Sequence, residues 1–126
     1  MTVKELYEQA KSLMFEKKSS RDYDNYYMPW LNTLLSEGFK INNQLRLFKG
    51  KEALTSIPRV TAETDELTYE DEMLYEVLPY GLAANFYIDD DVSKYDILHT
   101  YYQNSLFGCI RGMEVDNTNT WEDEEE

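Results

Sequence analysis

The chain has 126 residues, of which 42% are hydrophobic and 29% are charged, and its formal net charge is −13 at pH 7. This length allows one domain with a modest core, and the negative charge disfavours a protein that binds nucleic-acid phosphates through a broad basic face. The single cysteine excludes an intrachain disulfide framework and a multi-cysteine zinc site, and no apolar run resembles a signal peptide or a membrane span.

The first predicted helix covers residues 2–16. Thr2 and Glu5 have the spacing of a capping box, in which each side chain accepts a hydrogen bond from the other residue's backbone. Apolar residues then recur every three or four positions, which is the period of an amphipathic helix. A polar loop over 17–22 should follow.

The second helical region is predicted over 25–49, as one long helix or two shorter ones. Asp22 or Asp24 is the candidate N-cap, and Pro29 fits only the first turn because proline lacks the backbone donor. Gly38 weakens the helix without necessarily ending it, and the apolar stripe continues to Gly50.

Residues 51–67 show no helical stripe and predict a long connection across the surface. Leu54, Ile57 and Val60 are its candidate anchors. A connection of this length in a small domain is often functional, although it can also simply span two distant helix ends. We give both interpretations equal weight, and take Ile57 and Val60 as candidate partner-binding residues.

A helical hairpin is predicted over 68–113. Thr68 is the expected N-cap of its first helix, with Glu70, Asp71 and Glu72 in the first turn, where carboxylates favour the positive end of the helix dipole. The small residues Gly81, Ala83 and Ala84 should let another helix approach closely.

The second helix of the hairpin should begin at Asp91 or Ser93 and end near Arg111 and Gly112. Its apolar stripe consists of Leu98, Tyr101, Tyr102, Ser105, Leu106 and Cys109. The preceding Asp89–Asp91 turn is interpreted as solvated, because it lacks the glycine, alternating ligands and distant glutamate of a calcium loop.

Residues 114–126 carry seven acids and no basic residue, and predict a disordered acidic tail. Trp121 has no local core to join, and tryptophan is a typical anchor in partner pockets. Trp121 with Glu122 and Asp123 is therefore a candidate partner-binding element, with a merely solvated tail as the equally weighted alternative. The domain division is 1–113 and 114–126.

Nothing in the sequence forms a recognisable catalytic, cofactor or metal site. His99 is the only histidine and is expected to be a packed or surface residue, and Cys109 a small buried hydrophobe. The glycines are scattered and form no phosphate loop. We therefore expect a protein that is not an enzyme and binds no cofactor or metal.

Several passages resemble the small head–tail connector (adaptor) proteins of tailed bacteriophages. These are TVKELYEQAKSLMFE at the start, FKINNQLRLFKGKEAL and IPRVTAETDELTYEDEMLYEVLPYGLAANFYIDDD in the middle, and KYDILHTYYQNSLFGCIRGM near the end. The resemblance covers most of residues 1–113, and rests on apolar spacing and turn acids rather than on a catalytic signature.

The resemblance implies a helical subunit that docks as a ring on the portal protein of the capsid, extends the DNA channel and contacts the next neck or tail component. It also implies a place in the virion neck after assembly in the host bacterial cytoplasm, with no membrane contact. DNA would pass without specific binding, which agrees with acidic walls that repel phosphate. The alternative is an acidic DNA-mimic or other protein-binding module.

The predicted fold class is all-α, a small bundle of four to five helices with the 51–67 connection and a disordered C-terminal tail. The core residues expected from the stripes are Leu6, Leu13, Trp30, Leu34, Leu74, Val77, Leu78, Leu98, Tyr102 and Leu106.

Overall fold

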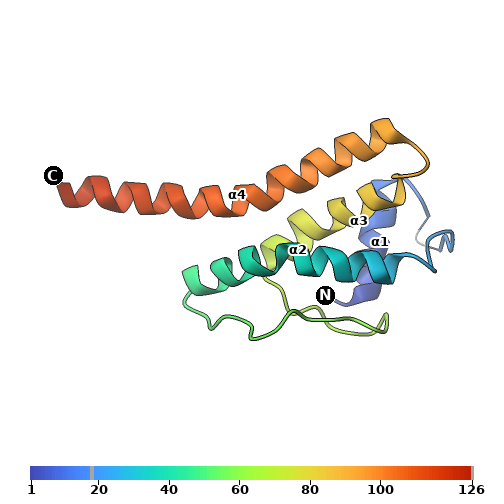
Figure 1. Cartoon of the computed structure of the whole chain (residues 1–126), viewed down its shortest axis with the longest axis horizontal. Helices are drawn as coiled ribbons and strands as arrows, with labels where there is room; N and C mark the ends of the chain where they lie inside the picture. Colours follow the sequence, from blue (N-terminus) through green and yellow to red (C-terminus); the bar gives the residue numbers. More distant parts are fainter. Residues whose placement is uncertain (18, 126) are drawn as a thin grey trace.

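The computed structural model describes the backbone of residues 1–17 and 19–125 and the side chains of residues 1–17 and 19–111. This part of the chain is a small helical bundle, so the predicted all-α class is confirmed (Figure 1). Its elements are α1 (Val3–Leu13), α2 (Tyr27–Phe48), the π-helix η1 (Glu72–Val77), α3 (Leu78–Phe86) and α4 (Val92–Glu125). The described residues form no strand, only one isolated antiparallel bridge between Thr2 and Glu66.

Helix α1 begins and ends with defined capping motifs. The capping box of Thr2 and Glu5 is present, as predicted. At the other end, Phe15 N–H donates to Ser12 O and Glu16 N–H donates to Lys11 O, which is the Schellman pattern. Phe15 occupies the left-handed position of this motif, with φ of 61°.

Helix α2 is one continuous helix with Pro29 in its first turn. Gly38 is buried at its centre, where an added Cβ would lie 2.5 Å from Met73 Cε. The glycine is therefore explained by the close approach of η1, and it does not interrupt the helix.

The 51–67 connection runs back along α2 (Figure 1), and asparagine side chains of α2 hold it there. Asn32 accepts from Val60 N–H at 2.9 Å and donates to Val60 O at 3.0 Å. Asn43 does the same with Leu54, at 2.8 and 3.2 Å. These amides replace the partners that a strand would supply to an extended backbone.

The helix expected from Thr68 starts later than predicted. Thr68 is exposed, Asp71 is the N-cap of η1, and Glu70 precedes the helical segment. Glu70 is buried rather than solvated in a first turn, and its backbone N–H donates to the buried Asn42 at 2.8 Å. The ion pairs of Glu70 and its hydrogen bond to the Asn42 amide thus place Glu70 before the helix, although the local sequence predicted an N-cap at Thr68.

Helix α3 is surrounded by the other helices. A Cβ added to Gly81 would lie 2.8 Å from Tyr102 Cδ1 on α4 and 2.9 Å from Leu34 Cδ2 on α2. Ala83 and Ala84 are fully buried. The close helix approach predicted from these small residues is confirmed.

Helix α4 packs on α3 and η1 along its first half and then continues beyond the bundle (Figure 1). It does not end at Gly112, as predicted, but runs to Glu125. Once a helix is nucleated, each further residue adds a hydrogen bond, and one glycine costs only about 1 kcal/mol.

Most of the predicted core is buried. Leu13, Trp30 and Leu98 are only partly buried but pack against the core. The buried members of the prediction are Leu6, Leu34, Leu74, Val77, Leu78, Tyr102 and Leu106.

Candidate functional site

Helix α4 buries one side and leaves an apolar side uncovered. Tyr102 and Leu106 face the bundle at 3% and 8% exposure. Ile97 and Tyr101 lie on the opposite side and are 60% and 57% exposed. The sequence placed Tyr101 on the buried stripe, and this was wrong, because helical spacing alone defines a stripe too broadly to fix its edges.

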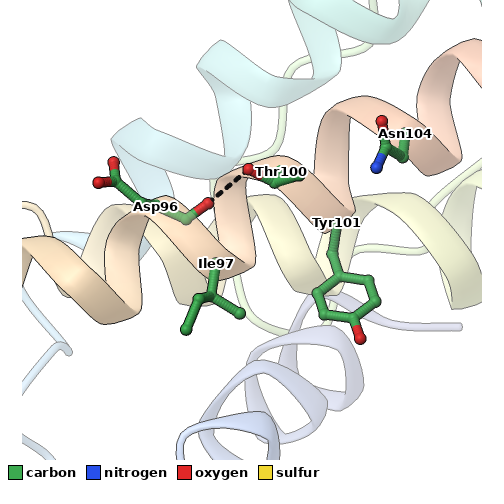
Figure 2. A pocket seen from close by; sticks show the side chains of 5 residues that line it. All are labelled: Asp96, Ile97, Thr100, Tyr101 and Asn104. Carbon is green, nitrogen blue, oxygen red and sulfur yellow. Dashed lines mark hydrogen bonds between the residues drawn. The ribbon is translucent and has the colours of Figure 1, made fainter.

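Ile97 and Tyr101, together with two polar residues of α4, enclose an open depression. Ile97, Thr100, Tyr101 and Asn104 have the spacing i, i+3, i+4 and i+7, which is the set that forms the hole of a knobs-into-holes contact. Figure 2 shows Ile97 and Tyr101 pointing the same way from α4, while Thr100 Oγ1 donates to Asp96 O at 2.7 Å. We call this feature, with Asp96 at its edge, the α4 depression.

One carboxylate lies at the edge of the α4 depression, and others lie in the turn before the helix. Asp89 and Asp90 are exposed in the α3–α4 turn, and Asp96 is exposed on α4. None of the three forms an ion pair with a described residue, whereas Asp91 lies 4.0 Å from Lys94 Nζ. Two exposed apolar side chains, Ile88 and Val92, accompany these acids. The depression therefore has apolar walls and one carboxylate at its edge.

Aromatic contacts connect this surface to the residues that pack beside and beneath it. Tyr80 of α3 stacks on Tyr101 with ring centroids 5.5 Å apart. His99 stacks on Tyr95 at 5.1 Å and contacts Tyr102, so it is a packed residue, as expected. Tyr102 donates to Glu37 Oε1 at 2.9 Å, and burial raises the pKa of its hydroxyl.

A second polar cluster lies where α2 ends and η1 begins. Glu70 is 6% exposed and accepts from Arg46 at 3.3 Å and from Lys51 at 2.8 Å. Lys49 lies 3.3 Å from Glu70 and donates to Glu72 at 2.6 Å. Every charge here has an opposite partner, so the cluster is a structural ionic network.

The pKa values in this cluster follow from its contacts. Burial raises the pKa of Glu70, but the hydrogen bonds from Lys51 and Lys49 outweigh burial and hold it below its ordinary value. The hydrogen bond to Glu72 raises the pKa of Lys49. Both shifts favour the charged forms, which fits ion pairing rather than proton transfer at neutral pH.

The remaining chemical candidates give no reactive arrangement in the part of the chain that the structure describes. Burial raises the pKa of the Cys109 thiol, which donates to Ser105 O within its own helix. No cluster of three potential metal ligands occurs among the described residues, and none of their helices is long and apolar enough to cross a membrane.

The predicted partner-binding residues are found in different environments. Ile57 is 47% exposed and remains a candidate. Val60 is 4% exposed and both its backbone groups bond to Asn32, so its side chain belongs to the core and is not open to a partner. The side chains of Trp121, Glu122 and Asp123 lie outside the described residues.

The α4 depression itself was not predicted from the sequence. The available signal was Ile97, an apolar residue that lies off the buried stripe and four positions before Tyr101. Comparisons with protein-family models, with curated proteins and with solved structures found no match for this chain. Its function therefore has to be argued from its own surfaces.

Proposed function

We propose that this chain is a structural adaptor subunit of a phage neck. It docks on the portal ring, extends the DNA channel and presents a platform to the next neck or tail component. The subunits form a ring on the portal, in the virion, and DNA passes through without specific binding. The proposal assigns the protein no enzymatic activity.

The observation that supports this function best is helix α4. Its first half is part of the bundle, and its second half continues outside it as a single helix, with six acids between residues 114 and 125 (Figure 1). Such an arm reaches a partner without disturbing the core. An aromatic residue among acids suits a pocket rimmed with Lys or Arg, because carboxylates speed the encounter and the indole supplies buried area.

The charge of the chain favours a ring that assembles on a template. Copies with a net charge of −13 repel one another when they stand side by side. Contacts with a portal offset this repulsion, so the isolated protein should be a monomer or a weak oligomer.

The test is co-sedimentation with a purified portal. Truncation after Met113, or Trp121→Ala, should weaken docking and leave the thermal melt of the bundle unchanged. Phe48→Ala is the matched control, since Phe48 is 50% exposed at the end of α2 and outside the arm. Raised salt should slow the association.

Docking of the truncated chain at full strength would remove the arm from the mechanism. Failure of every form of the protein, including the full chain, to bind any portal from the same genome would reject the adaptor function itself. Stable rings formed by the protein alone at low salt would reject the templating argument.

A further inference from the structure

Phe15 combines two unfavourable features at one position. Its backbone has φ of 61°, the left-handed conformation that glycine adopts without a steric penalty, and its ring is 99% exposed. A glycine here would complete the same Schellman motif without strain and without an apolar ring in water. Strain retained at an exposed side chain points to a binding role.

The position of Phe15 makes it a projecting knob. It follows α1 directly, and the Schellman hydrogen bonds of Phe15 and Glu16 to Ser12 and Lys11 fix its backbone. The ring therefore projects from a fixed base, although it makes no aromatic contact with a described residue. Lys17, two residues later, is exposed and forms no ion pair with the described chain.

The α4 depression has the complementary properties. It is a four-residue hole with apolar walls from Ile97 and Tyr101, and the exposed Asp96 at its edge has no ion-pair partner among the described residues. An aromatic knob with a lysine beside it matches an apolar hole with an aspartate beside it. The two features lie on different elements of the same chain.

We infer that Phe15 of one copy inserts into the α4 depression of a second copy, with Lys17 facing Asp96. The contact joins two different surfaces of one chain, so it is head-to-tail, and contacts of this type close into rings or extend into filaments. The inference deepens the proposed function, because it names the contact between neighbouring subunits.

The size of the contact agrees with assembly on a template. A phenylalanine ring buries roughly 150–250 Å², whereas a stable protein interface buries roughly 1,200–2,000 Å² in total. The contact should therefore be weak in solution and become populated when copies are held side by side. Its detection needs concentrated protein and covalent capture.

The experiment uses two single-cysteine forms of the full chain, both carrying Cys109→Ser. One has Ser19→Cys beside the knob, and the other has Ser93→Cys, one helical turn before Ile97. The two are mixed at high concentration, treated with a short bismaleimide, and the heterodimers are counted by mass spectrometry. Ser36→Cys on the exposed side of α2 replaces Ser93→Cys in the matched control.

The expected heterodimer yield is several-fold above that of the control. Phe15→Gly in the Ser19→Cys form should reduce it to the control level, while Phe15→Gly in the Ser93→Cys form should leave it unchanged, since that copy supplies the hole. Ile97→Arg should reduce the heterodimer yield when the Ser93→Cys form carries it and leave the yield unchanged when the Ser19→Cys form carries it. Lys17→Glu should lower the yield, and adding Asp96→Lys to the Ser93→Cys form should restore it.

Phe15→Gly should at the same time raise the melting temperature, because it removes the left-handed strain. A purely structural role for Phe15 would instead lower it. Equal yields with and without Phe15, or an effect that does not depend on which copy carries the substitution, would overturn the inference. No portal takes part, so the result is independent of whether the adaptor function holds.

Discussion

Helices α3 and α4 form one hairpin, yet they differ in how much of each is covered. Every member of α3 from Leu82 to Ala84 is buried, and α2, α1 and α4 all contact it. Helix α4 buries one side and leaves Ile97 and Tyr101 in solvent. Burial on all sides stabilises the fold, whereas apolar side chains that stay more than half exposed are available for binding. The difference makes the open side of α4 the candidate binding surface.

The two helices also begin differently. The segment leading to α3 starts from the buried Glu70 and its ring of cations, while α4 starts from the Asp91 cap in an exposed turn. The start of α3 is thus fixed by contacts distant in sequence, and that of α4 by a local hydrogen bond. The predictions below test the two helices and the segments at which they begin.

The largest effect is expected from Leu78→Ala in α3. Leu78 is fully buried, and removing its side chain should cost about 2–5 kcal/mol of unfolding free energy through lost burial and a cavity. Ile97→Ala on the open side of α4 should change stability by no more than about 0.5 kcal/mol. Urea unfolding of both variants measures the contrast, and equal losses would show that α4 is as fully packed as α3.

The ionic network before η1 should make stability depend on pH. The pKa of Glu70 is lower in the folded protein, so its contribution is present above the unfolded-state value of about 4.3 and is lost as pH falls through the folded value. Glu70→Gln should cost about 1–3 kcal/mol at pH 7, because hydrogen bonds to charged groups are lost. Glu63→Gln, at an exposed position, is the control.

Unfolding measured from pH 7 down to pH 3 checks this prediction. The difference between the unmodified protein and the Glu70→Gln variant should shrink as acid protonates Glu70. A difference that stays constant over the whole range would mean that the carboxylate charge contributes nothing.

Two glycines give opposite expectations for the same substitution. Gly81→Ala in α3 places a Cβ 2.8 Å from Tyr102 and 2.9 Å from Leu34, and should destabilise the fold by about 1–3 kcal/mol. Gly108→Ala in α4 meets only Arg111 Nη2 at 3.9 Å and should stabilise the helix by up to about 1 kcal/mol. Thermal melts with opposite shifts are expected, and shifts of the same sign would contradict the packing described.

What the sequence predicted correctly was local. The apolar stripes located the four α-helices of the described residues, and the small residues around Gly81 indicated the close packing of α3. The clamps of Asn32 and Asn43 escaped prediction because their partners lie 28 and 11 residues away, and an asparagine in a helix carries no sign of what its amide will bind. Such contacts exist only after the chain has folded.

The α4 depression was missed for a related reason. A stripe of apolar residues predicts that a helix has a buried side, but residues at its edge, such as Tyr101, can lie inside or outside. Tyr101 stacks on Tyr80 of α3 and stays 57% exposed, which helical spacing alone does not predict. Ile97 and Phe15 became candidates only once their exposure was known.

The smallest effect is expected at the turn between the two helices. Asp91 Oδ1 accepts from Lys94 N–H at 3.2 Å and caps α4, so Asp91→Ala should cost about 0.5–2 kcal/mol. Asp90→Ala should be nearly neutral, because Asp90 is exposed and its side chain bonds to no described residue. If the turn instead bound a divalent cation, both substitutions would lower stability only when calcium or magnesium is present. Thermal melts with and without these ions separate the two interpretations. We expect the ions to leave the melting temperatures of both variants and of the unmodified protein unchanged, because the turn offers carboxylates without a ligand cage.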